Sequence, residues 1–144
     1  MSLSHEQVEF VETDDLPGVQ SFYARVGYAG GAQPSDRLLV ASVDQSIVAA
    51  VRLCPEGGTL VLRGMYVAND HQGCGIGSRL LESISTMIGA SECWCIPFTH
   101  LKGFYSRIGF DVCEGPEIPL FISERWERYK ANGQKVVIMK RQKI

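Results

Sequence analysis

A glycine-rich run in the middle of the chain has the residue types of an anion-binding loop. It reads Gln-Gly-Cys-Gly-Ile-Gly-Ser over residues 72–78. A strand-like apolar run, 59–67, precedes it, and a helix-like run, 78–88, follows it. Glycines let the backbone turn tightly and let a bulky ligand come close, and the start of a helix presents main-chain N–H groups that lack intrahelical acceptors. We therefore expect this loop to hold the phosphate groups of a cofactor.

The spacing of the glycines narrows the choice of cofactor. A Walker phosphate loop ends in Gly-Lys-Ser/Thr, whereas here Gly77 is followed directly by Ser78, with no lysine between them. A dinucleotide fingerprint needs Gly-x-Gly-x-x-Gly and an acidic residue about 20 residues further on. Glu92 lies near that distance, but the third glycine comes one position early. A glycine-rich turn without any ligand stays open at this point.

Hydrophobic periodicity and turn residues predict the elements that position this loop. Seven strands are expected, over residues 8–13, 37–43, 46–53, 59–67, 92–96, 110–113 and 135–140, with hairpin loops at 44–45 and 54–58. Four helices are expected, over residues 16–26, 78–88, 101–107 and 121–131. Early strands join by hairpins and later ones alternate with helices. This order predicts an α/β (α+β) fold, in which helices cover the faces of a mixed sheet. Residues 1–144 are expected to form it as a single domain.

Composition and charge limit the classes of function. The formal net charge is −2, and the chain has no broad basic surface that would hold nucleic acid. No apolar run approaches the roughly 20 residues that a membrane-spanning helix needs. The polar N-terminus, residues 1–7, does not resemble a signal peptide. We therefore expect a cytoplasmic protein that binds neither nucleic acid nor a membrane.

The cysteine pattern predicts reduced thiols and no metal site. There are five cysteines: Cys54, Cys74, Cys93, Cys95 and Cys113. An odd number without a secretion signal is typical of reduced, buried cysteines. Cys93 and Cys95 form the one close pair, and no second Cys or His pair has zinc spacing. Cys74 lies in the glycine loop, where it is either a reactive thiol at a helix start or a donor of its main-chain N–H only.

Two separated motifs resemble those of the GCN5-related N-acetyltransferase (GNAT) family. The first is Gln-x-x-Gly-x-Gly, read as Gln72, Gly75 and Gly77. The second is Phe-Tyr-x-x-x-Gly-Phe over residues 104–110, beyond the strand expected at 92–96. The expected order of elements is similar to that family from end to end. The resemblance implies an acyl-CoA N-acyltransferase fold with splayed fourth and fifth strands, and acetyl-CoA as cosubstrate, without a metal.

The resemblance also implies roles for individual residues. The end of the fourth strand, at Met65, Tyr66 and Val67, would bond the pantetheine arm through its main chain, and Gly64 lies where a bulge could start the splay. The main-chain N–H groups of the loop would hold the pyrophosphate. The loop residues concerned are Gln72, Gly73, Cys74, Gly75, Ile76, Gly77 and Ser78. Tyr105 would be the general acid that gives a proton or a hydrogen bond to the departing thiolate.

The general base and the acceptor contacts are less defined. The expected fourth strand has no carboxylate at the place where many relatives carry one. Glu56, Glu92 and His100 are candidates, with His100 preferred because histidine as a residue type changes charge near neutral pH. A chain of water molecules is an equal alternative. Arg63 is expected to bind a carboxylate of the acceptor, with help from Arg52 if both share a face, and a local salt bridge is the alternative.

The function implied is transfer of an acetyl group from acetyl-CoA to the amine of a small-molecule acceptor, of which a carboxylate-bearing amine is one class. Three alternatives stay open: acetylation of proteins or peptides, a non-catalytic acyl-CoA sensor on the same fold, and an unrelated nucleotide-binding module. The segment 119–129 either closes the acceptor side or packs as a core or homodimer stripe. The residues of that stripe are Phe121, Ile122, Trp126 and Tyr129, and packing is favoured.

Overall fold

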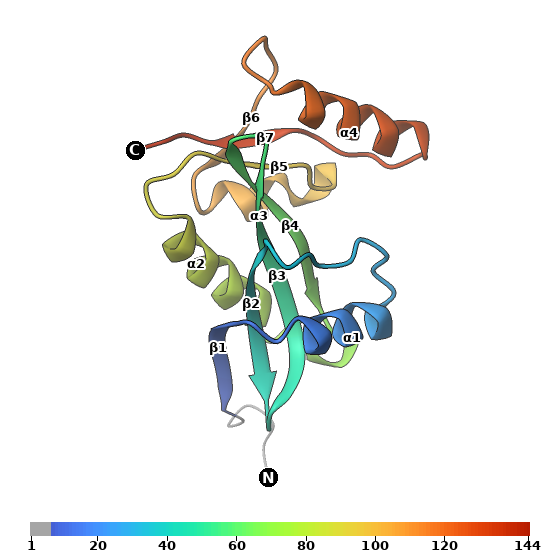
Figure 1. Ribbon diagram of the computed structural model, residues 1–144, viewed down its shortest axis with the longest axis vertical. Helices are drawn as coiled ribbons and strands as arrows, with labels where there is room; N and C mark the ends of the chain where they lie inside the picture. Colours follow the sequence, from blue (N-terminus) through green and yellow to red (C-terminus); the bar gives the residue numbers. More distant parts are fainter. Residues whose placement is uncertain (1–6) are drawn as a thin grey trace. The chain divides into compact units, whose positions relative to one another are not determined.

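The chain forms the mixed sheet that its sequence predicts. The computed structural model describes residues 7–144, so most of the polar N-terminal segment, residues 1–6, lies outside the described residues. The chain divides into two compact units, one of residues 1–54 and 62–87 and the other of residues 55–61 and 88–144. Residues 7–144 contain seven strands in the hydrogen-bonded order β1-β2-β3-β4-β5-β7-β6, together with four α-helices (Figure 1). The predicted fold class is confirmed.

The element bounds follow the predicted ones closely. The strands are β1 (Val8–Thr13), β2 (Arg37–Val43), β3 (Ser46–Glu56), β4 (Thr59–Val67), β5 (Cys93–Cys95), β6 (Phe110–Val112) and β7 (Met139–Arg141). The α-helices are α1 (Leu16–Val26), α2 (Ile76–Ile88), α3 (Lys102–Ser106) and α4 (Leu120–Ala131), and the short 3₁₀ helices are η2 (Asn69–His71) and η3 (Thr99–Leu101). β4 and β5 pair in parallel, whereas β1–β2, β2–β3, β5–β7 and β6–β7 pair antiparallel.

The first unit is built around β2, which is buried on both faces. Asp15 caps α1 by accepting a hydrogen bond from the Gly18 amide at 3.0 Å. Apolar residues of α1 and β2 form one buried cluster, which includes Val19, Phe22, Tyr23, Leu38 and Val40. Strand side chains alternate, so Leu39 and Ala41 face the opposite side, and they are buried as well. Figure 1 shows α1 and α2 on opposite flanks of β2 and β3.

The hairpin between β3 and β4 is tighter than the predicted loop 54–58. β3 continues to Glu56, and the turn is Gly57-Gly58, with both glycines in the left-handed region at φ 56° and 81°. Two such residues are what a two-residue hairpin turn requires. Pro55 does not end the strand, because β2 pairs no further along β3 than Leu53. Beyond that point no β2 neighbour needs the amide that proline lacks.

In the second unit, the pairing of β4 with β5 is short. It consists of Leu60 with Cys93 and Val61 with Trp94. β5 spans three residues, one fewer at each end than the predicted strand 92–96. This limited parallel pairing is consistent with the predicted splay of the fourth and fifth strands.

Three other elements differ from the predictions by more than one residue. α2 begins at Ile76, two residues before the predicted helix, so part of the glycine motif belongs to the helix. The predicted helix 101–107 is divided into η3 and α3. The predicted last strand, 135–140, contributes only an isolated bridge between Val136 and Phe98 before β7 begins at Met139.

α4 packs within the second unit, as the favoured prediction has it. Ile122 has no exposed surface, and Trp126 Nε1 donates to the Val136 carbonyl at 3.0 Å. Arg125 forms an ion pair with Glu56, next to the β3–β4 turn. The Phe121 ring lies so close to Gly57 that a Cβ there would come within 2.4 Å of it. The apolar side of α4 is therefore largely occupied by contacts inside the unit.

Candidate functional site

The glycine loop leads directly into α2 in the first unit. Gly73 and Gly75 have φ of 79° and 87°, which L-residues with side chains rarely adopt. The first hydrogen bond of the helix runs from the Arg79 amide to the Gly75 carbonyl at 3.1 Å. The amides of Ile76 and Gly77 precede that bond and have no acceptor within the helix, because a first helical turn has no carbonyl before it. These two amides are the groups that the predicted anion site would use.

Two side chains of the loop form hydrogen bonds that hold its shape and leave the space over its glycines open. Gln72 Nε2 donates to the Val67 carbonyl at 3.0 Å and to Asn69 Oδ1 at 3.2 Å. The Cys74 thiol donates to the His71 carbonyl at 2.9 Å and is exposed. A Cβ built on Gly73 or Gly75 would meet no protein atom within 4 Å. The space over these glycines is therefore open to a bulky ligand.

The C-terminal half of β4 lies in the same unit as the loop. Its side chains at Met65 and Val67 are half-buried, and Tyr66 is exposed. Gly64, just before them, has φ of 68° and interrupts the regular strand. The predicted contact of residues 65–67 with a pantetheine arm is a main-chain contact, so it places no demand on these side chains.

Tyr105 lies on α3 in the second unit and is 7% exposed. Its ring packs edge-on against Phe104 and Phe110, at 5.1 Å and 6.3 Å between ring centroids. Burial raises the pKa of Tyr105 well above its ordinary value, and the neighbouring Cys95 adds to the rise. The hydroxyl therefore keeps its proton throughout the neutral and alkaline range, as a hydrogen-bond donor must.

His100 is exposed on η3 in the second unit. Its ring stacks on that of Phe98, with 5.8 Å between the centroids and 17° between the planes. Phe98 covers one face of the imidazole, and the rest of the His100 side chain is exposed to solvent. The exposed ring is accessible to water, and its predicted role as a base stays a prediction.

The two carboxylates considered as bases are both used inside the second unit. Glu56 pairs with Arg125. Glu92 accepts hydrogen bonds from Thr59 Oγ1 at 2.9 Å and from Trp94 Nε1 at 3.1 Å, and Lys140 lies 3.3 Å away. These hydrogen bonds, the one from Thr59 above all, lower the pKa of Glu92. A carboxylate with a lowered pKa is a weaker base, which disfavours Glu92, and the ion pair with Arg125 disfavours Glu56.

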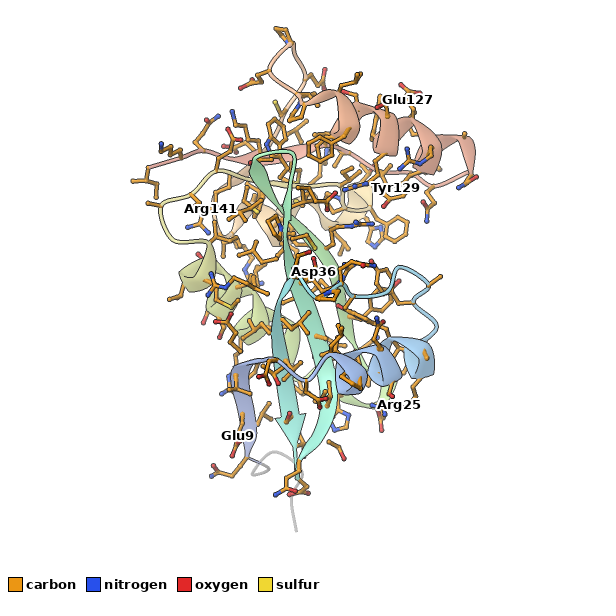
Figure 2. All side chains as sticks on the ribbon, viewed as in Figure 1. Glu9, Arg25, Asp36, Glu127, Tyr129 and Arg141 are labelled. Carbon is orange, nitrogen blue, oxygen red and sulfur yellow. The ribbon has the colours of Figure 1, made fainter. Side chains whose placement is uncertain are left out.

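The two arginines predicted to bind the acceptor have different surroundings. Arg63 is half-buried on β4. Arg52 is 1% exposed, and its predicted role is wrong in this structure because it has no surface left for an acceptor. Its guanidinium donates to Asp36 Oδ2 at 2.9 Å and to the Tyr28 hydroxyl at 2.8 Å. Asp36, labelled in Figure 2, is the residue that sequence reasoning missed here.

The second unit also contains a cavity that neither Tyr105 nor His100 lines. This cavity of about 660 Å³ is lined by the hairpin residues 55–60, Ser91, Glu92 and Lys143. Within residues 7–144, no three His, Cys, Asp or Glu side chains gather in a way that could hold a metal ion. None of the helices described has the length and apolar character to cross a membrane.

The sequence matches the model of a known domain family. The family is described as acetyltransferase (GNAT) domain, and the match covers residues 34–112. That range contains both motifs noted above, including Gln72 and Tyr105. A comparison with curated protein sequences found no match.

Solved structures share the fold at low sequence identity. An acyl-CoA N-acyltransferase from Pseudomonas aeruginosa has a TM-score of 0.71 and 15% identity, over 94% of this chain and 99% of that one. Escherichia coli ElaA has a TM-score of 0.66 and 14% identity, over 94% and 100%. N-acetylglutamate synthase from Neisseria gonorrhoeae, solved with coenzyme A and N-acetyl-glutamate, has a TM-score of 0.67 and 17% identity, over 96% of this chain and 35% of that one. At these identities the likeness establishes the fold.

Proposed function

Because the chain belongs to the GNAT acetyltransferase family, we propose that it transfers an acetyl group from acetyl-CoA to the amine of a small acceptor. The observation that carries the proposal is the loop before α2, whose glycines have left-handed backbones and open space over them. Residues 1–144 are proposed to form one acetyltransferase domain. The matched family range and the predicted motifs support this assignment.

The loop is proposed to bind the pyrophosphate of acetyl-CoA. The amides of Ile76 and Gly77 would donate to phosphate oxygens, and the positive end of the α2 dipole favours their negative charge. A side chain at Gly73 or Gly75 would occupy the open space that the phosphates need. The main chain of residues 65–67 is proposed to bond the amides of the pantetheine arm, as a neighbouring strand would.

In the proposed reaction a neutral amine attacks the carbonyl carbon of the thioester. A C–N bond forms, the C–S bond breaks with its electron pair on sulfur, and the amine nitrogen loses one proton. Tyr105 is assigned the stabilisation of the departing thiolate. Because a raised pKa makes Tyr105 a weaker acid, its main contribution is a hydrogen bond to the developing charge.

The amine proton leaves through His100 or through water. His100 has the solvent exposure that lets a base pass its proton on. Measuring kcat for His100→Ala separates the two routes. A large loss assigns the base to His100, and an unchanged kcat assigns it to water.

Arg63 is proposed to bind a carboxylate of the acceptor. A carboxylate-bearing amine is also the kind of acceptor that the product name N-acetyl-glutamate implies for the Neisseria gonorrhoeae relative. We expect Arg63→Ala to raise the acceptor KM about tenfold, because it removes a charge-assisted hydrogen bond. The KM for acetyl-CoA should stay unchanged, and Arg63→Lys should recover part of the acceptor affinity. An acceptor KM that does not move in Arg63→Ala would remove Arg63 from the site.

Ligand stabilisation and turnover test the proposed function. At about 100 times its Kd, acetyl-CoA should raise the Tm by about 5–10 °C, because it binds only the native protein. ATP and NAD should not raise it. Purified protein should then acetylate members of a panel of small amines, monitored by release of free CoA. Turnover of peptides and of no small amine would show that the acceptor is a protein or peptide. Stabilisation without any turnover would identify an acyl-CoA sensor. No stabilisation by any CoA ester would refute the proposal.

Alkylation of the cysteines locates the bound cofactor. Cys74 is exposed, Cys113 is half-buried, and Cys54, Cys93 and Cys95 are buried. N-ethylmaleimide should therefore modify Cys74 first, as read by mass spectrometry of peptides. Acetyl-CoA should protect Cys74 and leave the slower labelling of Cys113 unchanged. Equal labelling of Cys74 with and without acetyl-CoA would place the cofactor elsewhere.

A further inference from the structure

The backbone of Gly64 departs from the regular strand conformation. Gly64 lies in the interior of β4, yet its φ of 68° is in the left-handed region, which residues with side chains rarely adopt. A Cβ at this position would lie 2.6 Å from the Tyr23 hydroxyl oxygen and 3.2 Å from Arg52 Nε. Tyr23 and Arg52 therefore lie directly against the Gly64 backbone, and glycine is the residue that fits both the conformation and the space.

Tyr23 connects α1 to this turned residue. Its hydroxyl donates a hydrogen bond to the Gly64 carbonyl at 2.8 Å, across 41 positions in the sequence. The Tyr23 ring is 1% exposed and packs against Phe22 and Tyr28, at 5.9 Å and 4.7 Å between centroids. A ring buried in this way cannot turn its hydroxyl elsewhere. Burial also raises the pKa of Tyr23, so the hydroxyl keeps the proton it donates.

Arg52 supports Tyr23 from the other side. Its guanidinium carbon lies 5.9 Å from the Tyr23 ring centroid, and its two terminal nitrogens are held by Asp36 and Tyr28. Arg52 Nε is a buried nitrogen that has no hydrogen-bond partner among residues 7–144. The guanidinium is thus fixed at its far end and pressed against Gly64 and Tyr23 at its near end.

The hydrogen bond from Tyr23 also orients the next amide. A trans peptide unit is planar, and its C=O and N–H point in opposite directions. With the Gly64 carbonyl directed at Tyr23, the Met65 N–H is directed away from it. One side-chain contact therefore sets the direction in which residues 65–67 begin to present their main-chain groups.

We propose that Tyr23 is a positioning residue that holds the main chain of Met65–Val67 ready for the pantetheine arm of acetyl-CoA. This role rests on the proposed function, in which that segment bonds the pantetheine amides. Tyr23 does not touch the cosubstrate. It acts through the Gly64 carbonyl, and Arg52 keeps it in place.

Calorimetric binding of two ligands to Tyr23→Phe tests this role. The variant keeps the ring and loses only the hydroxyl. CoA, which carries the pantetheine arm, should bind about fivefold more weakly than it binds the wild type, the loss expected for one misplaced hydrogen-bonding segment. Adenosine 3′-phosphate 5′-diphosphate has both phosphates of the pyrophosphate and no arm, so its Kd should change by less than about twofold. A loss of affinity for both ligands, or for neither, would overturn the proposal.

A control on the same helix separates positioning from stability. Gln20 exchanges two hydrogen bonds with the main chain of Ala32, at 2.7 Å and 3.1 Å, and has no bond to β4. Gln20→Met should lower the Tm and leave the Kd of CoA unchanged. If it weakens CoA binding as Tyr23→Phe does, Tyr23 acts through stability alone. If the wild type itself binds no CoA, the proposed function fails together with this inference, and that outcome is distinct from a wild type that binds and a variant that binds equally well.

Structures of the wild type with and without CoA cover the case in which Tyr23→Phe does not fold. The main chain of residues 64–67 should have the same conformation in both, with the Tyr23–Gly64 hydrogen bond already present before CoA is added. A main chain that takes this conformation only with CoA would mean that the segment is ordered by the ligand and not by Tyr23.

Discussion

Replacing Tyr105 by phenylalanine should lower kcat by about 100-fold while leaving the fold and the affinity for acetyl-CoA intact. Loss of one donor to a developing negative charge in a site that excludes water typically has an effect of this size. The Tyr105 ring, packed edge-on against Phe104 and Phe110, remains in the variant. Steady-state release of free CoA with a good acceptor measures the effect.

Tyr129→Phe is the matched control. Tyr129, labelled in Figure 2, lies on α4 and is half-buried, and it has no role in the proposed chemistry. Its loss of a hydroxyl should leave kcat within about twofold of the wild type. The thermal stabilisation by acetyl-CoA should be the same in both variants. A Tyr105→Phe protein that turns over at the wild-type rate would show that the thiolate leaves without this hydroxyl.

The pH dependence of kcat follows from the burial of Tyr105. The pKa of Tyr105 is raised, so its protonated form persists above the ordinary titration of tyrosine near pH 10. Deprotonation of Tyr105 should therefore not reduce kcat up to about pH 10. A kcat that falls with an apparent pKa clearly below 10, and does so only in the wild type and not in Tyr105→Phe, would mean that Tyr105 is less buried during turnover.

Local signals explain why much of the fold could be predicted. The bounds of α1 follow from a cap at Asp15 and a proline at the second helical position, and both act within one turn. The two glycines 57 and 58 mark a hairpin whichever way the rest of the chain folds. The glycine loop was found because its geometry depends on a few adjacent residues and on the helix that follows.

Non-local contacts explain what could not be predicted. Arg52 was expected to help Arg63 bind an acceptor if the two share a face, and no residue near it in sequence indicates that it is buried instead. Its partners Asp36 and Tyr28 lie 16 and 24 positions away. The pairing of β2 with β3 brings Asp36 to it, and the packing of α1 on β2 brings Tyr28. Glu92, one of the candidate bases, likewise accepts a hydrogen bond from Thr59, which is 33 positions away. Charged residues in a predicted sheet can be assigned to a ligand or to an internal ion pair only when the register of distant strands is known.

Replacing Asp36 by asparagine should destabilise the protein by about 3–5 kcal/mol, because it leaves the Arg52 charge buried without a counter-ion. The two side chains are 4% and 1% exposed, so water cannot replace the lost carboxylate. Burial alone would lower the pKa of Arg52, but Tyr28 and Asp36 outweigh it and keep the guanidinium charged. Urea unfolding of the variant and the wild type measures the difference in free energy.

A second carboxylate–arginine pair of the same unit makes the prediction specific to burial. Glu12 and Arg37 form an ion pair at 2.8 Å, but their side chains are 46% and 49% exposed. Glu12→Gln should therefore cost less than about 1 kcal/mol, since exposed pairs are screened by water. The double variant Asp36→Asn/Arg52→Met removes the buried charge and should regain part of the stability that Asp36→Asn loses. Two results would contradict this account: a loss of unfolding free energy in Asp36→Asn no larger than in Glu12→Gln, or no recovery when Arg52 is removed as well. Either would mean that an uncompensated charge does not destabilise the variant, and that Arg52 is held by its packing against Tyr23 and Tyr28.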